Sequence, residues 1–371
     1  MDQETRRRIG QNDPTLTDLR IVSRFNSVRS PDNSHVGVCV CSNASDFAWL
    51  GETIGNNTSL GSVMLRGDNE LGAAIQMFAD GFKRNASILR LSLKDSVLSE
   101  GAAYETLMAF SENSSNLRDI SLLDCNFGNR GVATLTATLA NSSGVRYVNL
   151  QLCDIGDEVL AKLATSFREL VQLEAIDLSS NHIGSGGCES LAGILKHANS
   201  ILRIIALDRN DVDDKGAIAL ANALVGNTEL EELHLDRNNS ITTVGWDAFS
   251  QVLCNTSSIN ATYCSNHTLQ RLEEFECEVV PNEVSCLLDM NCNCNKRDVA
   301  MKKILRLHRH FDMKPFFELG LKVLPIAVGW LVRAGANESA GNNGIDFGGR
   351  MLSIFFQFAG AMPMQFVPDV H

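Results

Sequence analysis

Six Cys and His side chains between residues 277 and 310 of this 371-residue sequence are of the types that bind zinc. They are Cys277, Cys286, Cys292, Cys294, His308 and His310. Structural zinc sites normally pair two cysteines separated by two residues, whereas Cys292 and Cys294 are separated by one. The spacing therefore favours free thiols, and we expect neither a metal site nor a cofactor.

The sequence contains none of the common catalytic motifs. It lacks the Gly-Lys pair of a phosphate-binding loop, a His-Glu-x-x-His motif and a Gly-x-Ser-x-Gly nucleophile turn. The 11 cysteines are odd in number, and the opening MDQETRRRIGQNDPTLTD contains no apolar run that could act as a signal peptide. We therefore expect a protein without catalytic activity in the reducing cytoplasm.

The charge balance bears on the class of partner. The chain has 32 Lys and Arg against 44 Asp and Glu, a formal net charge of -12. An acidic chain is repelled by nucleic acid and by anionic lipid, so we expect neither nucleic-acid nor membrane binding. A protein partner with a basic surface fits this charge.

One basic run departs from this balance: Lys296, Arg297, Lys302, Lys303, Arg306, Arg309 and Lys314. Nucleic-acid binding is one interpretation of such a run. The basic residues, however, alternate with the apolar stripe of a helix that contains Ala300, Ile304 and Leu307, and no aromatic residues lie between them. We predict a solvated helix face.

The elements that position any site come from an internal repeat. An apolar-x-x-apolar-x-apolar pattern begins at Leu117, Val145, Leu173, Leu202 and Leu230, with successive spacings of 28, 28, 29 and 28 residues. Each pattern ends at a fixed turn residue: Cys125, Cys153, Asn181, Asn210 or Asn238. Because the two cysteines occupy positions that asparagine fills elsewhere, they are predicted to be turn residues and not reactive thiols.

The second half of each unit has helical spacing, with pairs such as Leu191 and Leu195 four residues apart. A strand, a turn and a helix cannot bury their apolar side alone, but stacked units can. The Asn-x-Ser/Thr sequences at Asn57, Asn85, Asn113 and Asn141 also recur every 28 residues. This spacing indicates recurring turns and not glycosylation sites.

The repeat resembles the leucine-rich repeats of the ribonuclease-inhibitor type, and SITTVGW, SSINATYCSNHTLQRL and NKRDVAMKKILRLH resemble algal leucine-rich-repeat proteins. The resemblance implies an α/β solenoid, or horseshoe, with a parallel sheet on its concave side, helices on its convex side and a helical C-terminal cap. It also implies protein binding. The same repeats occur in Ran GTPase-activating proteins, so activation of a Ran-like small GTPase is the alternative function.

The loss of the period divides the chain into three predicted parts. Residues 1–45 form a polar segment, partly disordered or capping, with a short strand at 35–40. Residues 46–269 hold seven to eight repeats. Residues 270–371 form the helical cap, which includes the apolar segment 351–368 as a buried helix.

Alternation along each strand predicts which side chains face outward on the sheet. The outward positions form three columns: Asp119, Tyr147, Ala175, Ile204 and Glu232; Ser121, Asn149, Asp177, Ala206 and His234; and Leu123, Gln151, Ser179, Asp208 and Asp236. Earlier units place Arg66, Arg90 and Lys94 in equivalent positions. The surface is therefore predicted to change from basic to acidic along the array.

We predict that a monomer binds a protein partner on this concave surface. The predicted contact residues are Tyr147, Asn149, Asp177, Ile204, Asp208, Glu232, His234 and Asp236. The alternative is that they only keep an exposed sheet soluble, because Arg209 and Arg237 lie beside the acidic column and can neutralise it.

Overall fold

The computed structural model describes residues 3–22, 35–41, 43–67, 74–112, 116–273, 280–292 and 295–308. The strands are β1 Asp18–Val22, β2 Val36–Val40, β3 Ser62–Arg66, β4 Arg90–Val97, β5 Asp119–Asn126, β6 Tyr147–Asn149, β7 Ala175–Asp177, β8 Ile204–Ala206 and β9 Glu232–His234. The helices are α1 Gln3–Gly10, α2 Ala44–Asn56, α3 Ala74–Arg84, α4 Gly101–Glu112, α5 Gly128–Ala140, α6 Asp157–Glu169, α7 Ser185–Leu195, α8 Asp214–Ala223, α9 Thr243–Leu253, α10 Ile259–Tyr263, α11 Asn282–Asn291 and α12 Lys296–Leu307.

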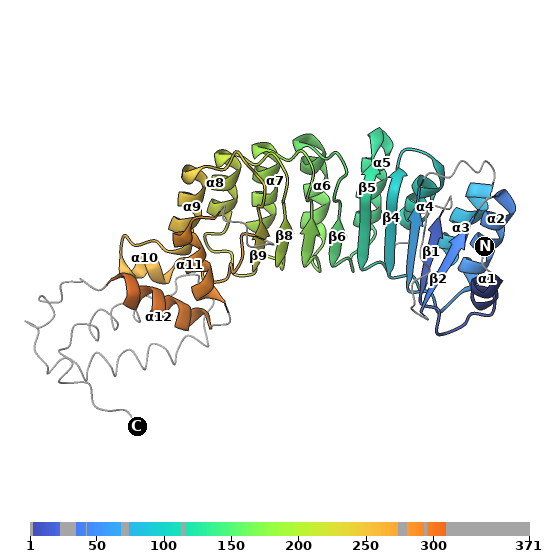
Figure 1. Ribbon diagram of the computed structural model, residues 1–371, viewed down its shortest axis with the longest axis horizontal. Coiled ribbons are helices and arrows are strands. Elements are labelled where there is room, and N and C mark those ends of the chain that lie inside the picture. Colours follow the sequence, from blue (N-terminus) through green and yellow to red (C-terminus); the bar gives the residue numbers. More distant parts are fainter. Residues whose placement is uncertain are drawn as a thin grey trace, which may run out of the picture.

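The strands form one parallel sheet in the order β2-β1-β3-β4-β5-β6-β7-β8-β9. From β3 to α9, each strand is followed by a helix, and the helices line one side of the array while the strands line the other (Figure 1). Parallel neighbours need such a crossover, and the helix of each unit supplies it. The predicted α/β solenoid is confirmed.

The core lies between the sheet and the helices. Leu122, Leu150, Leu178, Leu207 and Leu235, one from each of five units, are at most 1% exposed. They share one buried layer. Each unit therefore buries its apolar side against its neighbours, as a solenoid requires.

At the N-terminal end of the array, the order of the strands in the sheet differs from their order in the sequence. The predicted strand at 35–40 is present as β2, which pairs with the outer side of β1. Helix α2 then crosses β1, and β3 pairs with the other side of β1. The described parts of the polar segment thus supply α1 and two strands of the sheet. The boundaries at residues 45 and 269 stay predictions.

Buried asparagines join successive units at the turn that follows each strand. The Oδ1 atom of Asn181 accepts hydrogen bonds from the backbone N–H groups of Cys153 and Ile155, both at 3.0 Å. Its Nδ2 atom donates to the carbonyl oxygens of Leu150 and Leu178, both at 2.8 Å. Asn210 and Asn238 bond in the same manner.

The two cysteines at this turn position act as predicted. The thiols of Cys125 and Cys153 donate to the carbonyl oxygens of Leu93 and Leu122, at 3.4 and 2.8 Å. Burial raises the pKa of both thiols to about 12, so they stay protonated at neutral pH. They are turn residues and are not activated nucleophiles.

Asn57 and Asn85, which begin two of the recurring Asn-x-Ser/Thr sequences, are also turn residues. Asn85 is buried, and its Nδ2 atom donates to the carbonyl oxygens of Ile54 and Asn57, both at 2.7 Å. Asn57 is buried as well and accepts from the backbone N–H of Leu60. Recurring turn chemistry therefore explains the 28-residue spacing. Asn113 lies outside the described residues.

A left-handed residue directly precedes the turn position in six units, and Ser96, which pairs with Cys125 in the sheet, holds that position in the unit of β4. These residues are Asp95, Asp124, Leu152, Ser180, Arg209 and Arg237, with φ between 52° and 59°. In four of these residues, Asp124, Leu152, Ser180 and Arg209, the backbone N–H donates to a carbonyl oxygen of the next unit, as that of Leu152 does to Ser179 at 3.1 Å. This conformation strains residues other than glycine, asparagine and aspartate, and a bulky leucine is unusual there.

Replacement of Leu152 with asparagine is therefore expected to stabilise the fold by roughly 0.5–1 kcal/mol, because asparagine tolerates the left-handed conformation. The Leu152 side chain is 49% exposed, so little burial is lost. Val171 is similarly exposed, at 51%, but has no positive φ. Urea unfolding followed by circular dichroism should show the gain in Leu152→Asn and not in Val171→Asn. An equal change in the free energy of unfolding in both variants would show that the left-handed conformation does not strain Leu152.

Helices α10, α11 and α12 lie beyond β9, at the end of the array opposite α1 (Figure 1). The prediction that the basic run of α12 is a solvated face is wrong for Lys303, which is fully buried. Its ammonium group donates to carbonyl oxygens of the array, which offset the cost of burial. Arg309, Lys314 and the segment 351–368 lie outside the described residues.

Among the described residues, no helix is both long enough and apolar enough to cross a membrane.

Candidate binding site on the sheet face

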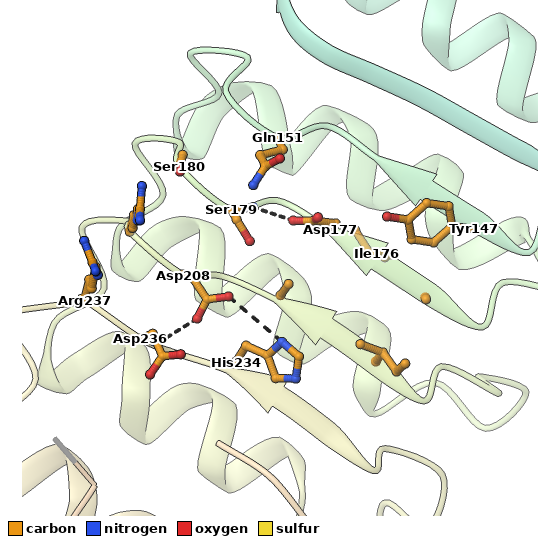
Figure 2. A pocket seen from close by; sticks show the side chains of 14 residues that line it. Tyr147, Gln151, Ile176, Asp177, Ser179, Ser180, Asp208, His234, Asp236 and Arg237 are labelled. Atoms are coloured by element: carbon orange, nitrogen blue, oxygen red, sulfur yellow. Dashed lines mark hydrogen bonds and ion pairs between the residues drawn. The ribbon is translucent and has the colours of Figure 1, made fainter. Parts of the chain in front are cut away.

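The sheet face is the surface formed by the outward side chains of β5 to β9. Strand register aligns Tyr147, Ala175, Ile204 and Glu232 in one row, and Asn149, Asp177, Ala206 and His234 in the next. Two of the three predicted columns are thus in register, whereas the third lies beyond the ends of β6 to β9. A depression of about 600 Å³ opens on this face and crosses the units of β6 to β9 (Figure 2).

Six of the eight predicted residues line this depression: Tyr147, Asp177, Ile204, Asp208, His234 and Asp236. The other two adjoin it. Asn149 donates to the Tyr147 hydroxyl at 3.1 Å, and a carboxylate oxygen of Glu232 lies 3.0 Å from His234 Nε2. The structure thus brings the predicted set together, although whether it binds a partner stays a prediction.

Two of the carboxylates lie deeper than predicted. Asp208 and Asp236 were expected on an exposed surface, but they are only 8% and 5% exposed. Asp208 Oδ1 accepts a hydrogen bond from the backbone N–H of Asp236 at 2.8 Å. A short side chain that bonds to the backbone of the next unit lies along the sheet surface and does not project from it. The Asp208 side chain therefore also joins two successive units.

His234 lies between two acids. Its Nε2 atom is 3.0 Å from Glu232, and its Nδ1 atom is 4.0 Å from Asp208. Figure 2 shows Asp208, Asp236 and His234 directed toward one another at one side of the depression. Glu232 also pairs with Arg271 at 3.3 Å. The imidazole thus links the acids of neighbouring strands.

The opposite side of the depression is apolar. Tyr147 contributes a half-buried ring, and Ile204 is 36% exposed. Burial, and next the negative charge of Asp177, raise the pKa of Tyr147, so its hydroxyl remains neutral at physiological pH. An incoming side chain would meet an aromatic ring and a branched aliphatic group beside acids.

The turn residues Ser180, Arg209 and Arg237 also line the depression. They hold the left-handed position directly before Asn181, Asn210 and Asn238, and this offset is the sequence signal for their location. Figure 2 places Arg237 across the depression from Tyr147. Within the described ranges, no ion pair joins Arg209 or Arg237 to an acid of the site.

Among the residues that the structure describes, no three His, Cys, Asp or Glu side chains are grouped so that they could hold a metal ion. Neither Cys286 nor Cys292 forms a disulfide bond within the described residues. Cys277, Cys294 and His310 lie outside the described residues.

Known proteins share the repeat. The family model described as "Leucine Rich repeat" matches residues 142–164, 172–192 and 198–221. A ribonuclease inhibitor from Mus musculus is 36% identical over 74 residues, which cover 20% of this chain and 16% of the inhibitor. The match thus spans a small part of the inhibitor's length.

Two solved structures are similar to this chain, with low TM-scores. The tropomodulin C-terminal domain from Caenorhabditis elegans has a TM-score of 0.35 at 16% identity, with 48% of this chain and 98% of that chain covered. An internalin from Listeria monocytogenes has a TM-score of 0.31 at 14% identity, with 58% and 70% covered.

The three segments matched by the family model fall on the units of β6 to α8, where the strand, turn and helix recur most regularly. The inhibitor match and the 28-residue parallel units agree with that assignment. The units of β6 to α8 are therefore leucine-rich repeats, and they are similar to those of the ribonuclease inhibitor.

Proposed function

We propose that the chain is a non-catalytic module that binds a protein partner on its sheet face, with the depression between Tyr147 and Asp236 at the centre of the interface. The observation that supports this most directly is the depression itself, which joins apolar groups and acids from four successive units. Stacked repeats offer extended surfaces to other proteins, and a few central residues usually dominate the affinity.

Tyr147 and Ile204 are the proposed anchors. Both offer apolar surface to solvent, and they stand in the same row on strands that are two apart in the sheet. Interface hot spots are enriched in aromatic side chains that fill a partner's pocket. Truncation of either anchor is expected to weaken binding by about tenfold or more.

The acids are proposed to steer a basic partner. Asp177 is the best acid to test, because its Oδ1 atom accepts from the nearby backbone N–H of Ser179 at 2.9 Å and its Oδ2 atom accepts only a long hydrogen bond from Asn149 Nδ2, at 3.5 Å, among the described residues. Asn149 makes the same bond to Gln151 in the preceding unit, so asparagine can replace Asp177 without loss of the turn. Asp177→Asn is expected to slow association more at low salt than at high salt.

The test is a quantitative pull-down from a lysate with the full chain as bait, beside Tyr147→Ala/Ile204→Ala. The matched control is Val225→Ala/Val244→Ala, which truncates exposed valines outside the depression. A partner of the sheet face should be lost with the first variant only. Stopped-flow association of that partner with Asp177→Asn at two salt concentrations then tests steering.

Equal recovery with both double variants would place the interface elsewhere and overturn the proposal. If Asp177→Asn associates at the wild-type rate at both salt concentrations, the proposed basic partner surface is wrong.

A further inference from the structure

A buried lysine fastens the cap helix α12 to the last unit of the array. Lys303 is fully buried, and its Nζ atom donates to the carbonyl oxygens of Leu253 and Asn266, at 2.7 and 3.2 Å. Leu253 is the last residue of α9. The ammonium group thus lies at the negative end of the last array helix, where a cation is favoured.

A histidine completes this contact. His267 Nδ1 lies 3.3 Å from Lys303 Nζ, and its Nε2 lies 3.0 Å from the carbonyl oxygen of Tyr263. An ammonium group can only donate, so Nδ1 must accept, and a carbonyl oxygen can only accept, so Nε2 must carry the proton. The neutral Nε2–H tautomer therefore satisfies both partners.

We propose that His267 and Lys303 form an acid-sensitive latch that holds α12 on the array and opens when Nδ1 of His267 is protonated. Protonation removes the acceptor for Lys303. It also places two cations 3.3 Å apart in a buried site, where their repulsion is weakly screened. Release of α12 moves both groups into water.

The surrounding groups do not offset the added charge. Burial raises the pKa of the Cys254 thiol, so it stays neutral. Within the described ranges, no carboxylate forms an ion pair with Lys303 or His267. Lys296, in the first turn of α12, is a further cation and donates to the carbonyl oxygen of Thr228 at 2.7 Å.

His308 is the other titratable group at this contact. Its Nε2 atom lies 2.7 Å from the Thr262 hydroxyl, and burial lowers its pKa. It faces a hydroxyl group and not a cation, so a hydrogen bond to Thr262 survives its protonation, because a hydroxyl can also accept. A test of the latch must separate the two histidines.

The direction of the pH effect follows from burial. Burial, and next the charge of Lys303, lower the pKa of His267 to about 4, from 6.5 for a free histidine. Released α12 leaves His267 free to bind a proton near pH 6.5, whereas docked α12 prevents this until about pH 4. Docking is therefore weakened as the pH falls from 6.5 toward 4, by about 30-fold at pH 5.

Lys303 acts in a separate pH range. Burial lowers its pKa to about 8, from 10.5 for a free lysine. The docked state therefore binds fewer protons than the released state between these values, and docking strengthens as the pH rises through that range. Acid opening is thus not a property of Lys303.

The test is hydrogen exchange of the full chain at pH 7.5 and pH 5, corrected for the intrinsic pH dependence of exchange. In the wild type, α12 is expected to lose about 30-fold of its protection at pH 5, while α7 keeps its protection. His267→Gln retains an acceptor for Lys303 and a donor for Tyr263, and it should abolish most of the loss. His197→Gln, at an exposed site on the array, should respond like the wild type.

Two further variants sharpen the result. His308→Gln should retain most of the acid response. Lys303→Met should weaken protection at pH 7.5 but respond less to acid, and it tests the latch if His267→Gln does not fold. Unchanged α12 protection at pH 5 in the wild type, a full acid response in His267→Gln, or parallel loss in α7 would each overturn the proposal.

Discussion

Replacement of Asn181 with alanine is expected to lower the free energy of unfolding by roughly 3–5 kcal/mol, because it leaves two N–H and two C=O groups without their partner in the core. The amide bonds to Cys153, Ile155, Leu150 and Leu178 at 2.8 to 3.0 Å. These bonds join two units, so their loss weakens the interface between repeats as well as the turn.

Urea unfolding followed by circular dichroism measures this effect. Asn181→Cys should lose less than Asn181→Ala, because Cys125 and Cys153 occupy the same position and donate one hydrogen bond each. The control is Asn199→Ala, on the exposed loop after α7, which should stay within about 0.5 kcal/mol of the wild type. Equal losses in the two alanine variants would contradict the role of the buried amide.

Replacement of Gly81 with alanine is expected to destabilise the first units by about 3 kcal/mol. Helices α2 and α3 pack backbone against backbone at Gly51 and Gly81, and a Cβ atom on Gly81 would lie 2.0 Å from the Gly51 carbonyl oxygen. Backbone cannot rotate away as a side chain can. The helices must separate, which also disturbs the edge-to-face contact of Phe47 and Phe78.

Gly193→Ala in α7 is the matched control. Its Cβ atom would approach only the end of the flexible Arg168 side chain, at 3.1 Å. Since alanine favours helix over glycine, this variant should be neutral or gain up to about 1 kcal/mol. Thermal unfolding of both variants checks the contrast, and a similar melting temperature for the two would mean that α2 and α3 can separate at little cost.

The sequence alone determined what repeats. The Asn181 side chain bonds to the equivalent turn one unit earlier. A period of 28 residues, together with alternation along the strand, therefore predicts the positions of the turn residues, the buried leucines and the outward rows. Tyr147, Asp177 and Ile204 could be assigned to one surface for the same reason. A regular array makes long-range contacts predictable because each is a copy of a contact one period away.

Only the tertiary structure decided the features that break the repeat. The depth of Asp208 depends on a hydrogen bond to the next turn, and an alternating pattern fixes the direction of a side chain but not its depth. The order β2-β1-β3, the contact of Gly51 with Gly81 and the burial of Lys303 join segments that have no equivalents elsewhere in the chain. Such contacts depend on how unlike surfaces pack, and periodicity carries no information about them.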